Sequence, residues 1–442
     1  MYSSLNIQAK SEQVLCRRSP YKKFIAPRVF KLVVAFLILG FIPLNTLAND
    51  TPDDKTKARN NNLDWLKTSG FGRIVGGYID VTSGNEDLRF VDYENKDFSF
   101  SNQSLIGMQV DASYSKKLKL SAQAVAHSNE KRESGIEWLY LSYKPNDKLT
   151  TKIGKLRLPF FNYSDVINVG YAYQWITPPR QVYLDYLFSN YNGVNVQYSQ
   201  ALEDAIIQIE GSYGQFDDDI MVQGQSTNVK VDDLRGVVLK FIDGAYTTRL
   251  SYHEGFVFDV VTPLDTLAEN LVIAGFNRQA DVFNTKGKVS TSQFGIAYNS
   301  LTYFYDIEII SIDSDIITIS DSNSGQITVG YNVNDLSIYA NYAVSLAHTD
   351  ILANQIPLGL DPRLDQLSFV YDQTSEKVQN SQDELQSYSL GLRWDFRPNF
   401  ALKFEISRHI GEKNKRAFFS ASPATGDQNS VVLYQTALEW VF

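Results

Sequence analysis

The segment Ser387-Tyr-Ser-Leu-Gly-Leu-Arg-Trp-Asp-Phe-Arg-Pro-Asn-Phe-Ala-Leu-Lys-Phe-Glu-Ile-Ser-Arg-His409 decides the fold. Apolar residues occupy every second position, first Tyr388, Leu390, Leu392, Trp394 and Phe396, then Phe400, Leu402, Phe404 and Ile406. Polar residues, glycine or alanine fill the positions between them. Because successive side chains of a strand point to opposite faces, this period of two predicts two β-strands, each with one apolar face. The Pro-Asn pair between them predicts a tight turn.

The same alternation recurs along the chain from Gly70 onward. We count sixteen segments of about ten residues, the length that a tilted strand needs to cross a bilayer. They lie at 72–82, 103–114, 117–128, 136–144, 148–157, 190–199, 205–215, 234–242, 245–255, 288–298, 301–312, 324–333, 336–346, 385–397, 399–409 and 429–442.

The gaps between these segments alternate strictly between short and long. Seven are tight, such as Asp243-Gly244 and Asn334-Asp335, and the other eight are longer. A secreted sandwich, jelly roll or propeller would explain the alternating residues but not this sorting of connections. An outer-membrane barrel explains both, with short periplasmic turns at one rim and long external loops at the other. The sequence therefore predicts an all-β protein, a 16-stranded antiparallel transmembrane β-barrel.

Composition excludes other classes. The mean hydropathy of −0.23 is too low for a bundle of membrane helices. The 26 Tyr, 26 Phe and 5 Trp residues among 442 give more apolar surface than a disordered chain carries. One Cys and four His (His127, His253, His348 and His409) leave little material for disulfides, metal clusters or histidine-based catalysis.

The N-terminus predicts export. Seven basic residues between Lys10 and Lys31 precede the apolar run Leu32–Ile42, and Thr46 and Ala48 suit a cleavage site. We therefore expect residues 1–48 to be a signal peptide, 49–69 a short periplasmic lead-in and 70–442 the barrel. Loss of 1–48 would remove seven of the 41 basic and one of the 50 acidic residues, leaving a net charge of −15 and no Cys. Such a chain is not expected to bind nucleic acid.

Two stretches carry a resemblance to a known family. The chain ends in Trp440-Val441-Phe442, and a terminal strand that closes on Phe resembles the signal read by the barrel assembly machinery. The segment Ile153–Asp165, continuing through Val169–Trp175 and Pro178-Pro179-Arg180 to Phe188–Gly193, resembles the fifth strand and third loop of the Gram-negative porin superfamily, including porin-like proteins of marine bacteria. The resemblance implies an outer-membrane protein in contact with lipid and lipopolysaccharide, and a homotrimer.

The resemblance implies that the gap 158–189 corresponds to the loop that in porins folds into the lumen and narrows it. Nine aromatics in this gap favour an ordered, buried loop. We expect the constriction to be formed by Lys155, Arg157, Asp165, Arg180 and Asp185. Acid and base facing each other there would orient polar solutes. Alternatively, Arg180 caps loop carbonyls and Asp165 is a turn residue.

Further charged residues fall on the polar, lumen-facing side of the predicted strands. They are Asp111, Lys119, Glu210, Arg249, Asp306, Glu308, Arg393, Arg397, Lys403 and Glu405. Their signs are mixed, so they indicate neither a ladder of bases for anions nor an aromatic wall for sugars.

Two features belong to the expected external loops. Acidic runs, such as Asp217-Asp218-Asp219, are a solvated surface or a site for divalent cations that bridge lipopolysaccharide. Thr262 and Pro263 predict the start of a helix with an apolar stripe through Leu267, Leu271 and Ala274. The alternative is an extra strand at 270–275.

The predicted function is a water-filled channel for passive diffusion of small hydrophilic solutes and ions. The alternative within the same fold is a substrate-selective porin for anions such as phosphate, or for sugars. An enzymatic barrel would need a Ser, His and acid set, which the four His do not indicate. The sequence predicts no catalytic residue, cofactor or metal.

Overall fold

The computed structural model describes residues 65–442 except 184–188, 223–224, 260–261 and 421–427. The expected signal peptide 1–48 and the predicted site residue Asp185 therefore lie outside the described residues. Among the described residues, no helix is both long and apolar enough to cross a membrane.

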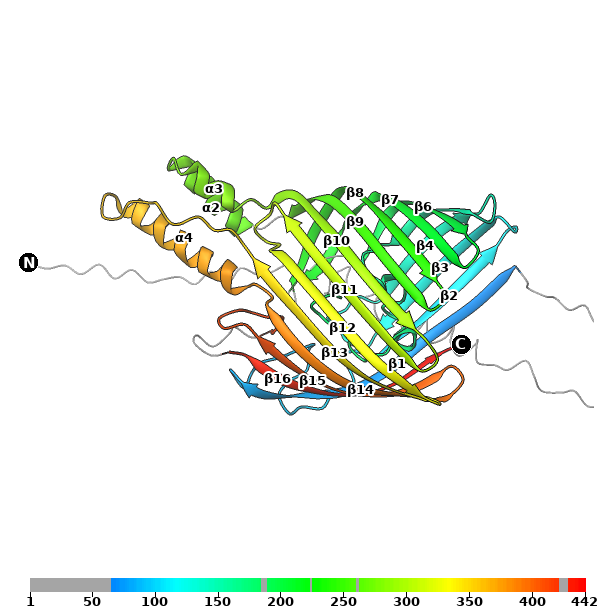
Figure 1. Ribbon diagram of the computed structural model, residues 1–442. Coiled ribbons are helices and arrows are strands. Elements are labelled where there is room, and N and C mark those ends of the chain that lie inside the picture. Colours follow the sequence, from blue (N-terminus) through cyan, green and yellow to red (C-terminus); the bar gives the residue numbers. More distant parts are fainter. Residues whose placement is uncertain (1–64, 184–188, 223–224, 260–261, 421–427) are drawn as a thin grey trace, which may run out of the picture. The chain divides into compact units, whose positions relative to one another are not determined.

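Sixteen antiparallel strands form one closed barrel (Figure 1). The first eight are β1 (Leu66–Ser83), β2 (Leu105–Ser113), β3 (Leu118–His127), β4 (Gly135–Tyr143), β5 (Leu149–Arg157), β6 (Asn190–Ala201), β7 (Ala205–Val222) and β8 (Gln225–Asp243). The last eight are β9 (Tyr246–Asp259), β10 (Lys286–Asn299), β11 (Tyr303–Ser314), β12 (Asp321–Val333), β13 (Leu336–His348), β14 (Leu385–Arg397), β15 (Phe400–Gly411) and β16 (Ser430–Val441). Each strand pairs with its sequence neighbours, and β1 pairs with β16 to close the barrel.

Every strand corresponds to one predicted segment, so the predicted fold class is confirmed. The largest differences in strand boundaries are at two places. The first strand begins at Leu66, four residues before the expected start of the barrel. The hairpin β7–β8 continues through 216–222 and 225–233, which the sequence assigned to a long external loop. The aspartates of this extension, among them Asp217 and Asp233, lie on exposed positions and interrupt the apolar alternation that identified the other strands.

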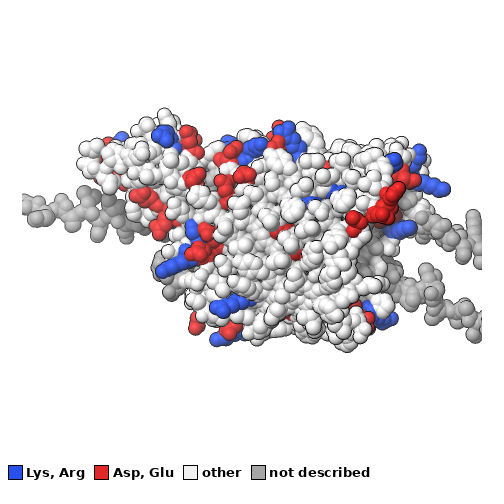
Figure 2. All heavy atoms as spheres, viewed as in Figure 1, with Lys and Arg blue, Asp and Glu red and all other residues white. Residues whose placement is uncertain are grey.

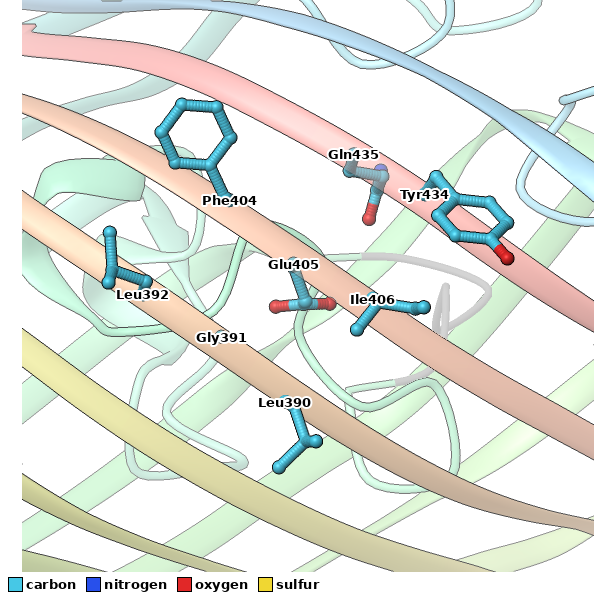
Figure 3. A pocket seen from close by; sticks show the side chains of 8 residues that line it. All are labelled: Leu390, Gly391, Leu392, Phe404, Glu405, Ile406, Tyr434 and Gln435. Atoms are coloured by element: carbon cyan, nitrogen blue, oxygen red, sulfur yellow. The ribbon is translucent and has the colours of Figure 1, made fainter.

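The barrel wall is apolar outside and polar inside. On β15, Phe404 and Ile406 are exposed, whereas Lys403 and Glu405 between them are buried. On β14, Leu390 is 61 % exposed. Figure 3 shows this part of the wall, where Leu390, Leu392, Phe404, Ile406 and Tyr434 line a hollow of about 420 Å³. Exposed apolar side chains over a whole wall require an apolar surrounding, which a bilayer supplies.

Charged side chains gather toward the two ends of the barrel, and most of the wall between them is uncharged (Figure 2). The end that holds the C-terminus carries tight turns, in which Gly244, Asn334 and Asn399 have positive φ angles. The opposite end carries the longer connections.

Three helices lie in two of these connections: α2 (Thr262–Ile273), α3 (Asn277–Val282) and α4 (Pro362–Asn380). They pack through a shared cluster that includes Leu267, Leu271, Phe283 and Tyr371. The predicted helix after Thr262 is confirmed, and the alternative strand at 270–275 is wrong. The helices project from the rim at the far end from the C-terminus (Figure 1).

Candidate functional site: the loop inside the barrel

Residues 158–189 connect β5 and β6. The part 158–183, which we call the inner loop, folds into the barrel. It contains two short 3-10 turns, Ser164–Val166 and Gly170–Ala172. Its aromatic rings pack on one another: Tyr163 lies 5.3 Å from Trp175 and 5.9 Å from Tyr173, and Trp175 lies 5.7 Å from Tyr183 between ring centres. The rings form an apolar core inside a polar barrel, as the aromatic content predicted.

Arg249 of β9 and Glu308 of β11 hold the first part of the inner loop. Both side chains are almost fully buried. Arg249 Nη1 donates to the carbonyl of Phe160 at 2.9 Å, and Nη2 donates to the carbonyl of Pro159. Glu308 accepts from the backbone N–H of Asn162 at 3.1 Å and from the hydroxyl of Tyr183. These bonds satisfy backbone groups that the loop cannot pair within itself.

Lys403 and Glu405 of β15 hold the second part. Lys403 Nζ donates to the carbonyls of Gly170 at 2.9 Å, Tyr173 at 2.6 Å and Trp175 at 3.0 Å. The same Nζ lies 2.7 Å from Glu439 Oε2 of β16. Glu405 accepts from the backbone N–H of Ile176 at 3.0 Å and from the hydroxyl of Tyr339 at 2.5 Å.

Two arginines complete this arrangement. Arg73 of β1 donates to the carbonyl of Ile176 and to the hydroxyl of Tyr173, each at 3.2 Å. Arg393 of β14 donates to the carbonyls of Tyr171 at 2.9 Å and Tyr173 at 3.1 Å. Burial raises the pKa of Tyr173 to about 12, so its hydroxyl remains a neutral donor near neutral pH.

Neutral side chains add further bonds between the inner loop and the wall. Trp175 Nε1 donates to Thr328 of β12 at 3.0 Å, and Gln181 Nε2 donates to Ser387 of β14 at 2.8 Å. Gln293 of β10 donates to Asn162, Gln181 donates to the carbonyl of Ala343 on β13, and Thr177 donates to Gln435 of β16. The polar contacts therefore come from β1 and from an unbroken arc of strands, β9 to β16.

The predicted lumen-facing charges fall into two groups. Six are buried on the inner face, and five of these bind the inner loop directly: Arg249, Glu308, Arg393, Lys403 and Glu405. The sixth, Asp306, accepts from Gln326 of β12.

The second group lies away from these contacts. Lys119 and Asp111 pair at 3.3 Å, and Asn195 donates to Glu210 at 2.6 Å. Arg397 is exposed at the end of β14, beside the turn to β15, and its guanidinium lies 5.9 Å from the ring of Phe400. After the register shift that follows Trp394, Arg397 is paired with Phe400, and Phe400 is paired with the outward Trp440. The predicted position of Arg397 in the lumen is therefore corrected to the outward face.

The register also corrects Lys155, which the sequence assigned to the lumen. Lys155 is opposite Leu139 and Asn192, both exposed outward. Directly paired residues share a face, so Lys155 lies on the outward face. The prediction failed because Leu156 and Leu158 were assigned to the lipid side, whereas both pack in the inner aromatic core.

The other predicted constriction residues occupy different environments. Arg157 is 7 % exposed and lies 3.5 Å from Glu137, so it pairs with the wall. Asp165 is exposed in the inner loop. Arg180 packs between the rings of Phe90 and Phe418, at 5.9 and 5.7 Å. The structure does not bring these residues together as one opposed set, and their role in a constriction stays a prediction.

Sequence reasoning missed Arg73 and Glu439. The two are directly opposite each other in the register that closes the barrel. Glu439 is the single charge of β16, and Arg73 is the only charge of β1 between Lys67 and Asp80. Such isolated charges of opposite sign on two strands were the available signal. In the described part of the chain, no three His, Cys, Asp or Glu side chains form a group that suits a metal ion.

The predicted assembly signal lies on the outer surface. The Trp440 ring covers Gly72, where an added Cβ would lie 2.4 Å from its Cζ2 atom. The Phe442 ring covers Gly70 in the same way, at 2.3 Å from Cζ. Both aromatic side chains thus lie against β1 at the closure of the barrel.

No protein-family model and no curated protein sequence matches the chain. Several solved structures match it. An anion-selective porin from Comamonas acidovorans has a TM-score of 0.50 at 11% identity, over 85% of this chain and 100% of that one. OmpF of Salmonella typhi has a TM-score of 0.48 at 11% identity, over 85% and 97%. The trimer form of OmpT, an outer membrane protein of Vibrio cholerae, has a TM-score of 0.47 at 11% identity, over 85% and 100%. The likeness to the Comamonas porin and the closed barrel of sixteen strands show that the chain has the porin fold, as its sequence predicted.

Proposed function

We propose that the protein is an outer-membrane porin through which small hydrophilic solutes and ions diffuse passively. The observation that carries the proposal is the inner loop, which is fixed by buried charges inside a closed barrel whose outer face is apolar. A barrel of sixteen strands leaves an aqueous lumen, and a loop held inside it narrows this lumen without a separate plug.

The arrangement supports a passage on one side of the inner loop. The polar anchors of the loop come from β1 and β9 to β16. On the other side, the inner faces of β2 to β7 carry Gln109, Asp111, Lys152 and Glu210. We infer that solutes pass along these polar side chains and past the exposed carboxylate of Asp165.

Cysteine labelling during planar-bilayer recording tests this route. The only Cys in the chain is Cys16, so a mature chain starting at Asn49 carries only the thiol that is introduced. In Asp165→Cys, a charged water-soluble thiol reagent should reduce the single-channel conductance. Ile153→Cys is the control, because Ile153 is exposed on the lipid-facing side of β5. Its conductance should not change.

Three results would each contradict a part of the proposal. Folded protein that gives no stepwise ohmic conductance would favour a closed or enzymatic barrel. An unchanged conductance in labelled Asp165→Cys would reject the proposed route while leaving the channel itself intact. A strong preference for anions or sugars in liposome swelling would replace the general porin with the selective one.

We further infer the partners from the same fold. Trp440 and Phe442 would present the terminal strand to the barrel assembly machinery, and the mature protein would be a homotrimer in contact with lipid and lipopolysaccharide. Light scattering of the detergent-solubilised protein tests the trimer. Lower amounts of folded protein in cells that express Phe442→Ala would support the assembly signal.

A further inference from the structure

We propose that Lys152 of β5 and Glu210 of β7 form a binding site for short zwitterionic peptides on the wall of the passage. This inference rests on the proposed function, because it concerns a solute inside the same lumen. Both side chains are half-buried. Their neighbours Ile153 and Ile209 are exposed on the outer face of the barrel, so Lys152 and Glu210 lie on the inner face.

The site lies between the inner loop and the end of the barrel that carries the tight turns. Lys152 is close to the start of β5 at Leu149, whereas Leu156, further along the same strand, packs in the inner aromatic core. Glu210 is likewise in the first part of β7, which starts at Ala205 after a tight turn. A solute that has passed the inner loop therefore meets the site before it leaves the barrel at this end.

A neutral aromatic ring orients Lys152. Its Nζ lies 5.6 Å from the centre of the Tyr140 ring on β4. Tyr140 in turn packs against the aromatic core of the inner loop, which fixes the position of the ring. A cation–π contact holds an ammonium group without an opposite charge, so the charge and the N–H donors of Lys152 remain for a solute.

A neutral amide orients Glu210. Asn195 of β6 is buried, and its Nδ2 donates to Glu210 Oε1 at 2.6 Å. Asn195 is directly opposite Lys152 in the register of β5 and β6, so it lies between the two charged side chains. Because the amide carries no charge, the carboxylate of Glu210 keeps its full negative charge.

The absence of direct neutralisation selects the class of solute. Lys119 and Asp111, on the neighbouring part of the wall, pair at 3.3 Å and largely satisfy each other. Within the part of the chain that the structure describes, neither Lys152 nor Glu210 forms such an ion pair. A solute with one positive and one negative end gains from both charges, whereas an anion or a cation is attracted by one and repelled by the other.

The strand register gives the length of the solute. Lys152 is opposite Asn195, Asn195 is opposite Ser212, and Glu210 lies two residues from Ser212 on β7. Two strand spacings of about 4.8 Å and two residues of about 3.3 Å separate the Cα atoms of Lys152 and Glu210 by about 12 Å. An extended dipeptide spans about 7 Å, and a charge-assisted hydrogen bond of about 2.8 Å at each end brings the total to about 12–13 Å. A single amino acid is shorter by about 3.5 Å.

Liposome swelling with the folded mature chain tests the site. The probe is glycylglycine, and the reference solute is N-acetylglycinamide, which is similar in size but carries no charge. We expect the ratio of the two permeation rates to fall about threefold in Lys152→Met and in Glu210→Gln, as for the loss of one half-exposed charged contact. Lys119→Met is the matched control, because it removes a positive charge from the lumen outside the site. It should leave the ratio unchanged.

The proposal fails on any of three results. The first is an unchanged ratio in both variants. The second is a fall in only one of them, because a single charge would then select an anion or a cation. The third is an equal fall for glycine relative to its neutral isomer glycolamide, because the length of the solute would then not matter.

Two further measurements complete the experiment. Heat-dependent gel mobility shows that each variant is folded. Planar-bilayer conductance separates this site from the channel proposal. Normal conductance with an unchanged ratio would reject the site alone, whereas folded protein without conductance would reject the channel as well.

Discussion

Lys403 and Glu439 form an ion pair of 2.7 Å inside the barrel, and neither side chain is exposed. They lie on neighbouring strands, with Lys403 opposite Ala437 and Glu439 opposite Ala401. Because Lys403 also donates to three carbonyls of the inner loop, one charge pair joins the strand closure to the loop. The folding of the loop and the closure of the barrel are therefore coupled.

Replacement of Lys403 by Met should destabilise the protein strongly. The change leaves Glu439 as an uncompensated buried charge and removes a donor from three carbonyls, so we expect a loss of about 3–5 kcal/mol in the free energy of unfolding. Lys403→Met/Glu439→Gln should regain part of this loss. Urea unfolding, followed by heat-dependent gel mobility, measures the free energy of unfolding of each variant.

A surface pair provides the control for Lys403. Lys119 lies 3.3 Å from Asp111, and its side chain is 43 % exposed. Exposed pairs of this kind contribute about 0–1 kcal/mol, so Lys119→Met should change stability little. Equal losses in Lys119→Met and Lys403→Met would contradict the role of the buried pair.

Replacement of Arg249 by Met should release the first part of the inner loop. Phe160 and Pro159 would lose their donors, and each hydrogen bond to a charged group contributes about 1.5–3 kcal/mol. The loop would then move, so we expect a larger mean conductance and more frequent current fluctuations in planar bilayers. Lys240→Met is the matched control, because Lys240 is directly opposite Arg249 on β8.

The alternation of apolar and polar residues accounts for the part of this structure that was predictable from the sequence. The sequence placed Lys403 and Glu405 on the inner face, because they alternate with the apolar residues Phe404 and Ile406. Their contacts with the inner loop were not predictable, since residues 170–176 meet Lys403 and Glu405 only in the folded barrel. The same rule failed at Leu156 and Leu158, because an apolar side chain can also pack against loop aromatics inside the lumen. The extension of β7–β8 was missed because it lies above the apolar band, where outward positions are charged.

Replacement of Gly391 by Ala should disturb the inner loop indirectly. An added Cβ would lie 2.1 Å from Cζ of Tyr339, a buried ring whose hydroxyl donates to Glu405. Displacement of the Tyr339 ring would weaken its hydrogen bond to Glu405, the carboxylate that accepts from the Ile176 N–H. Overpacking of this kind costs about 1–3 kcal/mol in the free energy of unfolding. Gly211→Ala on β7 is the control, because nothing lies within 4 Å of its added Cβ. Thermal unfolding monitored by circular dichroism should separate the two variants, and equal midpoints would contradict the prediction.

The final prediction concerns ion preference. The chain after residue 48 carries fifteen more acidic than basic residues. Asp165 is the exposed charge of the inner loop, and the neighbouring Lys155 of β5 lies on the outward face. Rim charges act over about 8 Å at physiological salt and about 30 Å at 0.01 M. Reversal potentials should therefore show mild cation selectivity in dilute salt that fades as salt rises. Asp165→Asn should lower the selectivity, and Asp147→Asn, in an exposed turn at the other rim, should not. Strong anion preference at both salt concentrations would contradict this prediction and favour the anion-selective porin. It would mean that the buried arginines and lysines of the wall dominate the electric field in the lumen.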